Sequence, residues 1–243
     1  DRLGAMENLN ALKPANARQK REFARLEEAV DRETRPAVEA RYNYYSDSDR
    51  NRLDRYGLTG NFWLGNQKYG LEYRHTDARD RTRDNHAEDF LMTIYSRLTD
   101  RFSAGAGLGF TQLADRHTST FAAGHVRLDA KLFSGSAGVN VGREALTDTA
   151  ELIEDRIRAT HVGLYITQPL TERFSVHAGY RYRSFSDSNH ANELQLVSQY
   201  AIYLSPRITI GHRFRLLDFH KQAGSGYFDP NNYIANRAFT SLY

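Results

Sequence analysis

The residues that could do chemistry in this sequence are scattered along it. Nine histidines occur in 243 residues, but none forms a His-x-x-x-His pair or a His/carboxylate cluster with the spacing of metal ligands. The sequence also has no Gly-x-Ser-x-Gly element and no convincing Ser/His pair of the kind that a hydrolase uses. We therefore predict no catalytic residues, no metal site and no cofactor, and we expect that the protein is not an enzyme.

Two acidic stretches are better explained as solvated loops than as sites. Glu151, Glu154 and Asp155 fall in a predicted external loop, where hydrated charge is the usual state. The stretch from Asp47 to Asp49 offers oxygen ligands for a weakly bound calcium ion, but an ordinary polar loop has the same composition. We predict no ion at either place.

Two pairs of arginines give the clearest chemical signal: Arg181 with Arg183, and Arg213 with Arg215. Residues two apart share one face of a β-strand, and neighbouring strands lie ~4.8 Å apart. One strand, predicted from Leu194 to Leu204, intervenes between the two pairs, so the pairs would lie about 10 Å apart. Four cations in so small a patch repel one another unless water, carboxylates or an anionic guest screens them. We expect these arginines to form a basic stripe along a water-filled conduction path.

The strands that would carry this stripe belong to a repeating unit. Short breaks opened by a leucine, such as LTDRF at 98–102 and LTERF at 170–174, recur at spacings of 34, 34, 38 and 34 residues. Between the breaks, apolar and polar residues alternate with period two, which indicates strands rather than a helical repeat of the same length. In one example Phe174, Val176, Ala178, Tyr180 and Tyr182 oppose Ser175, His177, Gly179, Arg181 and Arg183.

Each unit holds two strands, one tight turn at the leucine and one longer polar connection. The longer connections are predicted at residues 46–53, 76–87, 114–119, 145–155, 186–192 and 218–232. Tight turns at one edge and longer polar loops at the other are typical of an antiparallel up-and-down meander. We count twelve strands after Pro36.

Several features favour a membrane barrel over a soluble β protein. The strands are about ten residues or longer, whereas soluble strands average ~5–6. Aromatic residues lie beside the tight turns, where an interfacial girdle is expected: Phe62, Phe102, Phe133 and Phe174.

The chain has no cysteine, no apolar run of ~18 residues and no signal peptide, and it opens at Asp1, as a mature form or an excised fragment would. Its net charge of +3 is too small to indicate nucleic acid as a partner.

The polar face of this predicted sheet is more basic than acidic. We assign to it Arg41, Arg74, Arg97, Arg127, Lys131, Arg181, Arg183, Arg213 and Arg215, against Glu39, Glu72, Asp129 and Glu144, with Tyr95, Tyr165 and Tyr203 interleaved and His125 and His177 nearby. Charged rings and stacking platforms are means by which pores select solutes. A wide water-filled barrel with mixed charges and Arg–carboxylate pairs for rigidity would have the same composition, and both interpretations stay open.

The first thirty-five residues do not alternate. Leu3, Met6, Leu9 and Leu12 are three apart, Pro14 interrupts, and helical spacing resumes from Phe23 to Val30. The sequence predicts a helix, a proline break and a second helix in residues 1–35. The Leu-x-Pro-x-Asn step at 12–16 resembles a junction between tetratricopeptide repeats, although a generic helical hairpin has a similar pattern. Because tight turns face the periplasm in such barrels, we expect this segment to be periplasmic.

A helical periplasmic segment joined to such a barrel resembles the exopolysaccharide export porins, which secrete poly-N-acetylglucosamine, cellulose and similar polymers. Arg41–Leu58 resembles the first hairpin after the repeats in that family, and Gly226–Tyr233 (GYFDPNNY) resembles its late aromatic–Asp–Pro–Asn element. The resemblance implies a sixteen-stranded barrel in the bacterial outer membrane, partnered by lipid, a polysaccharide and periplasmic or inner-membrane synthase components. Only one predicted strand follows Pro230, so either this segment is cut short or the barrel is smaller.

The sequence thus predicts an all-β transmembrane barrel over residues 36–243, with the helical segment at 1–35, that conducts a secreted exopolysaccharide. The alternatives are a self-contained twelve-stranded channel for anionic oligosaccharides and a surface receptor or adhesion barrel. The expected conduction path comprises Arg74, Arg97, Arg127, Tyr165, His177, Arg181, Arg183, Tyr203, Arg213 and Arg215. The expected gate comprises Tyr227, Phe228, Asp229, Pro230 and Tyr233, in a loop that folds either inward or outward.

Overall fold

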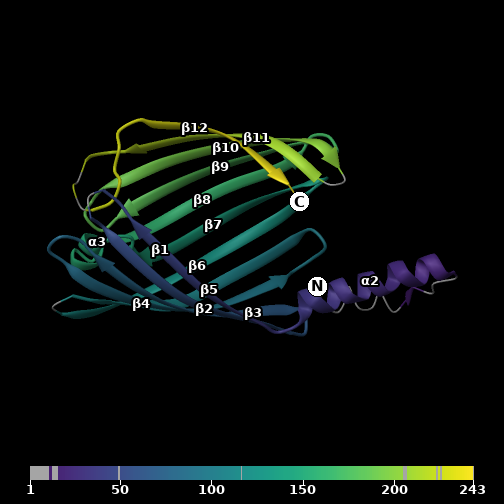
Figure 1. Cartoon of the computed structure of the whole chain (residues 1–243), viewed down its shortest axis with the longest axis horizontal. Helices are drawn as coiled ribbons and strands as arrows, with labels where there is room; N and C mark the ends of the chain where they lie inside the picture. The colour runs from purple at the N-terminus through teal and green to yellow at the C-terminus, as the bar shows by residue number, and fades with distance from the viewer. Residues whose placement is uncertain are drawn as a thin grey trace.

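The computed structural model describes residues 11–12, 16–48, 50–115, 117–204, 207–222, 224 and 226–242 (Figure 1). It shows one sheet of twelve antiparallel strands, in which each strand pairs with the next along the chain. The strands are β1 (Ala37–Ser46), β2 (Arg52–Leu64), β3 (Gln67–Arg79), β4 (Asp84–Arg97), β5 (Phe102–Ala114), β6 (Thr118–Leu132), β7 (Gly135–Ala145), β8 (Arg158–Pro169), β9 (Phe174–Phe185), β10 (His190–Leu204), β11 (Arg207–Phe219) and β12 (Tyr233–Leu242). The predicted twelve-stranded up-and-down meander is confirmed.

The sheet curls strongly, with long strands that run aslant (Figure 1). Among the described residues, β1 is hydrogen-bonded to β2 alone and β12 to β11 alone, so these two strands are its edges. The short helix α3 (Ala150–Glu154) lies in the connection between β7 and β8 and packs against β3, β4 and β5. We call the face that α3 contacts the inner face, and the opposite one the outer face.

The register gives the two faces opposite character. On β8 and β9, Tyr165 pairs with Gly179 and Leu164 with Tyr180, so each pair adds to one face only. The outer face exposes large apolar side chains; Leu108 is 73% and Leu164 54% accessible. Buried apolar residues are instead found where the sheet meets α3 and the nearby loops. This sheet therefore has its apolar surface outside and its polar surface inside.

The strands extend further than the sequence predicted at the edge with the longer loops. The connection expected at 76–87 is reduced to 80–83, because Arg79 pairs with Asp84 and their side chains bind each other at 2.9 Å. The connection expected at 186–192 ends at Asn189, so β10 begins four residues before the predicted strand start at Leu194. The prediction failed here because polar side chains occupy both faces of a strand once it projects into water, and alternation disappears.

Tyr203 was predicted on the polar face, and this assignment is wrong. The β10–β11 register shifts between Ala201 and Tyr203, as at a β-bulge, so Tyr203 pairs with Ile208. The extra residue moves the side chains that follow it to the other face. Tyr203 therefore shares the outer face with Ile208 and Ile210.

The helix α2 (Ala17–Thr34) contains the helical spacing seen from Phe23 to Val30 and leads directly towards β1. The Asn16 side chain accepts a hydrogen bond from the Gln19 amide at 2.9 Å, which caps the first turn. Pro36 stands two residues after the last helical residue, Thr34. Of the helix predicted before Pro14, all but Ala11 and Leu12 lies outside the described residues. No described helix is long and apolar enough to span a membrane.

Candidate functional site

Several rings on the inner face lie flat against glycines of neighbouring strands. The Tyr165 ring lies over Gly138, where an added Cβ would be 2.5 Å from Tyr165 Cε1. The His125 ring lies over Gly107 in the same way, with 2.6 Å between an added Cβ and His125 Cε1. A larger residue at either glycine would push the ring towards the middle of the concave space. The glycines thus keep these rings flat and the inner space open.

Arginines on this face are held by carboxylates on the same strand or on the adjacent one. Arg127 donates from Nε to both carboxylate oxygens of Asp129 at 2.9 Å and from Nη2 to the Tyr165 hydroxyl oxygen at 2.7 Å, and the Tyr165 hydroxyl in turn donates to Asp129. Arg74 donates from Nε to Asp89 at 2.8 Å. These ion pairs fix long side chains against the wall, as expected where mixed charges line a polar space.

The four arginines of the predicted stripe do not form one uniform patch. Glu193 stands between the two pairs: its Oε1 accepts from Arg215 Nε at 2.7 Å and its Oε2 accepts from Arg183 Nη2 at 3.2 Å. Arg181 lies directly opposite Glu193 in the register, yet within the described chain neither Arg181 nor Arg213 has a carboxylate partner. The predicted stripe is therefore divided into two cations that share one carboxylate and two cations without a carboxylate partner in the described chain.

Glu193 and Asp89 were missed in the assignment of the polar face. The predicted strand began at Leu194, so Glu193 was left between a loop and a strand. Extending the alternation backwards from Gln195 would have placed Glu193 on the inner face, because side chains two apart share a face. Asp89 was missed for the same reason, because it lies close to the end of the predicted 76–87 connection. Its partner Arg74 had been assigned to this face.

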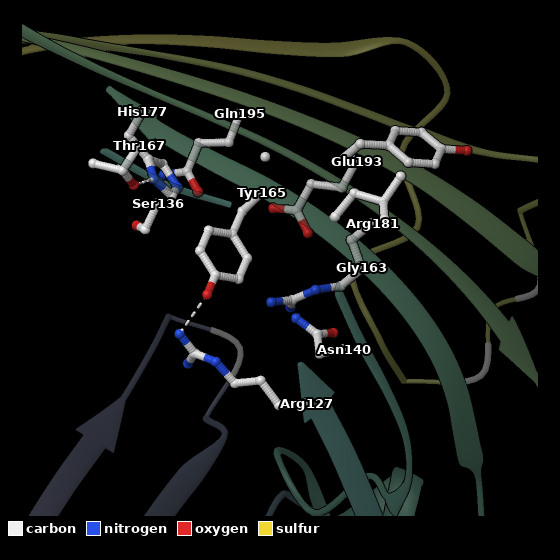
Figure 2. A pocket seen from close by; sticks show the side chains of 13 residues that line it. Arg127, Ser136, Asn140, Gly163, Tyr165, Thr167, His177, Arg181, Glu193 and Gln195 are labelled. Carbon is white, nitrogen blue, oxygen red and sulfur yellow. Dashed lines mark hydrogen bonds between the residues drawn. The ribbon is translucent and has the colours of Figure 1, made fainter. Parts of the chain in front are cut away.

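A cavity of about 520 Å³ opens on the inner face of β6 to β10 (Figure 2). Its lining includes Arg127, Ser136, Asn140, Gly163, Tyr165, Thr167, His177, Gly179, Arg181, Glu193 and Gln195. Figure 2 shows Tyr165 near the centre, with Arg127 at its hydroxyl, His177 and Thr167 to one side and Arg181 and Asn140 to the other. Four of the predicted path residues thus line one cavity: Arg127, Tyr165, His177 and Arg181.

The other predicted path residues lie elsewhere. Arg74 borders a second, smaller hollow on the inner face with Asp89 and His161. Arg97 is at the end of β4, where it donates to Asp100 at 2.9 Å and to the Thr99 carbonyl oxygen at 3.2 Å, next to a tight turn. Arg183 and Arg215 flank the cavity through Glu193.

The segment 146–157, which contains α3, bridges the two sides of the curled sheet; we call it the plug. Ala150 and Ile153 pack with inner-face residues of β2 to β5, including Ala78 and Leu113. Leu152 packs on the opposite side with Ile157, at the end of the plug, and with residues of β8 to β11: Ala159, Phe185, Ala191, Leu217 and Phe219. The sequence had predicted only a solvated external loop here, because three carboxylates in five residues hide the two apolar anchors.

Ion pairs fasten the rim of the plug to the loops around it. Arg83, in the β3–β4 loop, contacts Glu154 through Nε and lies 3.7 Å from Glu151. Arg55 on β2 donates to Asp148 at 2.7 Å. Each such pair is partly exposed, and pairs of this kind contribute ~0–1 kcal/mol. The carboxylates predicted to be merely solvated therefore orient the plug, while its buried apolar residues hold it.

The predicted gate residues lie in a loop that packs beside the plug. The Tyr227 ring stacks on Phe185 at 4.8 Å and lies 5.5 Å from Phe219, and its hydroxyl donates to Asp187 at 2.7 Å. Burial, followed by this hydrogen bond, raises the pKa of Tyr227. The Pro230 carbonyl oxygen accepts from the Phe219 amide at 3.1 Å, Asp229 accepts from the Gly224 amide at 3.3 Å, and Phe228 meets Tyr233 edge to face at 5.2 Å. The Thr149 hydroxyl donates to the Gly226 carbonyl oxygen at 3.2 Å, which links this loop to the plug.

Comparisons with known proteins add nothing to this geometry. No protein-family model matches the sequence, and no curated protein matches it either. In the portion of the chain that the structure describes, three or more His, Cys, Asp or Glu side chains nowhere gather as a metal ion would require. The site must be interpreted from its own residues.

Truncating a buried anchor of the plug should release it without disturbing the sheet. Ile153 is fully buried, and Ile→Ala changes at such positions cost about 2–5 kcal/mol. We expect Ile153→Ala to speed amide hydrogen exchange across residues 146–157, measured by mass spectrometry. Ile166→Ala, on the outer face, is the matched control and should leave that exchange unchanged. Equal exchange in wild type and Ile153→Ala would show that the plug is not held by this cluster.

The loop that holds Arg83 should resist acid. Burial favours the neutral form of Asp80, but hydrogen bonds from the Thr82 amide and from Arg83 outweigh this and lower its pKa from 3.8 to about 2. Its contribution to stability is therefore fully present above about pH 4 and is lost as the pH falls through about 2. The Asp80 carboxyl ¹³C shift should titrate near pH 2, and Arg83→Ala should move the midpoint upwards. A midpoint near 3.8 in wild type would contradict this arrangement.

Proposed function

We propose that residues 36–243 form an outer-membrane β-barrel, or most of one, through which a secreted exopolysaccharide leaves the cell. The observation that carries the proposal is the inverted polarity of the sheet. Apolar side chains are exposed along the outer face of nearly every strand, while arginines, carboxylates and histidines line the inner face. Monomeric soluble proteins rarely expose apolar patches larger than a few hundred Å², whereas lipid-facing and lumen-facing residues alternate in membrane barrels.

The edges of the sheet support closure in the intact protein. Backbone groups facing lipid must be hydrogen-bonded, so open edges at β1 and β12 are not tolerated in a bilayer. Either the two edges pair directly, or further strands lie between them, as the resemblance to sixteen-stranded export porins implies. Both alternatives give a continuous ring around a polar interior.

The two ends of the strands support an orientation. The tight turns and α2 lie at one end, because Ala37 at the start of β1 pairs with Asn61 close to the turn at 65–66. The plug and the loop carrying Tyr227 lie at the other end. In outer-membrane barrels short turns face the periplasm and longer loops face outward. The helical segment would then meet the synthase components in the periplasm, and the plug would close the outer mouth.

The free cations favour a second candidate, a channel for anionic oligosaccharides. Arg181 and Arg213 have no ion pair among the described residues, and unpaired charge on a pore wall attracts solutes of opposite sign. Export and uptake are separable by genetics, since they move carbohydrate in opposite directions.

Deleting the gene in its bacterial source should abolish secretion. We expect cell-surface carbohydrate to fall and polysaccharide to accumulate in the periplasm, and re-expression of the full-length gene should reverse both changes. Total sugar in the two fractions, measured with deletion and complemented strains side by side, checks this. Unchanged surface carbohydrate together with lost growth on external oligosaccharides would overturn export and favour uptake.

The membrane assignment predicts unequal costs for a charge on the two faces. Leu196 is 43% exposed on the outer face of β10, and Gln199 lies on the inner face of the same strand. Leu196→Arg should lower the free energy of unfolding in lipid vesicles by about 2–4 kcal/mol, because the guanidinium would enter hydrocarbon near the midplane. Gln199→Arg should cost much less, because it meets water. Equal costs in denaturant titrations would refute the assignment of the faces.

A further inference from the structure

The Tyr165 ring in the cavity is held by more contacts than a side chain on a simple polar wall requires. The Tyr165 hydroxyl is held by Asp129 and by Arg127 Nη2 at 2.7 Å, its ring lies over Gly138, and the Arg127 guanidinium carbon lies 5.1 Å from the ring centroid. These contacts fix one half-buried ring on the wall in a single orientation. A fixed, amphipathic ring in a water-lined space is a platform on which the C–H face of a sugar ring packs.

Groups without partners surround this platform. The Arg181 guanidinium is exposed and has no ion pair in the described part of the chain. The Gln195 side chain forms no hydrogen bond there either. An exposed guanidinium and an unbonded amide therefore lie in the space beside Tyr165.

The charge around the cavity does not balance. The basic groups are Arg127, Arg181, Arg183 and Arg215, and the acidic groups are Asp129, Glu193 and, close to Arg183, Glu144. Asp129 is used by Arg127, Glu193 is shared by Arg183 and Arg215, and Glu144 adds a negative charge near Arg183, so one positive charge remains uncompensated. Arg181 lines the cavity and has no ion pair in the described part of the chain, so it is free to form a bidentate contact, the geometry in which guanidinium binds a carboxylate.

We propose that this cavity is a binding subsite for an acidic sugar unit, a uronic acid within an oligosaccharide. The sugar ring stacks on Tyr165, its carboxylate binds Arg181, and its hydroxyls bind Gln195 and His177. A volume of about 520 Å³ falls within the ~300–1,000 Å³ of typical small-molecule sites. The subsite rests on the proposed conduit, and it identifies the polymer as acidic, which separates this chain from exporters of cellulose, a polymer without carboxylates.

Equilibrium binding to the detergent-purified protein tests the subsite. Calorimetry with trigalacturonate should show binding at least tenfold tighter than with its methyl ester, which has the same rings without the charge. Inorganic phosphate in place of the sugar should bind weakly, because it cannot stack on Tyr165. Equal binding of the acid and the ester would overturn the proposal. Phosphate binding as tight as that of trigalacturonate would assign the cavity to a bare anion instead.

Variants locate the binding within the cavity. Arg181→Gln should weaken trigalacturonate binding about tenfold, since a charge-assisted contact is lost, and should leave binding of the methyl ester unchanged. Arg213→Gln is the matched control, because Arg213 is also an unpaired cation on the inner face but lies outside the cavity. Tyr165→Ala should weaken binding of both ligands. If Tyr165→Ala does not fold, as judged by heat-modifiable gel mobility, Tyr165→Phe keeps the ring and removes its anchors, and should weaken both ligands to a smaller degree. An Arg213→Gln effect as large as that of Arg181→Gln would show that general charge, and not this subsite, attracts the sugar.

Conduction separates the two proposals. Trigalacturonate should block single-channel current of the reconstituted full-length protein, and Arg181→Gln should shorten the blocked periods about tenfold. A protein that conducts ions but binds no uronate would refute the subsite and leave the conduit standing. A protein that binds uronate in detergent and conducts nothing in bilayers would refute the conduit alone.

Discussion

The alternation of side chains along an unbroken antiparallel ladder is the constraint on which this structure depends. Each strand has an apolar outer face and a polar inner face, and a slip of one residue would exchange them throughout the strand. Among the described residues the register shifts at one place, between Ala201 and Tyr203, close to a tight turn. Beyond that point Tyr203 changes face and is exposed on the outer face.

This constraint leaves the inner face with no apolar core of its own, so other contacts must organise it. Glycines on one strand receive rings from the next, as Gly138 receives Tyr165, and carboxylates receive arginines from neighbouring strands, as Glu193 receives two. Both kinds of contact run along the wall rather than across the space. The interior is thus rigid without being filled, and the apolar packing that fills other proteins is confined to the plug at one end.

The sequence was sufficient to predict the features that repeat, and insufficient for those that occur once. The period-two pattern gave the strand number and the inner position of Arg181 and Tyr165, because those properties follow from backbone geometry alone. It could not give the partner of a particular side chain: Glu193 was missed where alternation fades near the strand end. The plug was missed because Leu152 and Ile153 are only two apolar residues among charges, and their burial depends on strands far away in the sequence.

The plug and the cavity place opposite demands on the same interior. The plug joins β2–β5 to β8–β11 through apolar contacts. The strength of these contacts does not depend on the charge of a solute, but it does depend on the exclusion of water from that end of the sheet. The cavity lies along β6–β10 and offers unpaired polar groups, which favour a wet interior and a charged guest. The ion pairs around Arg83 fasten the rim of the plug, where an anionic chain that reached it would compete with Glu151 and Glu154 for the same guanidinium. An acidic polymer could therefore bind Arg181 in the cavity and then displace the plug carboxylates from Arg83. A neutral polymer could form neither ion pair.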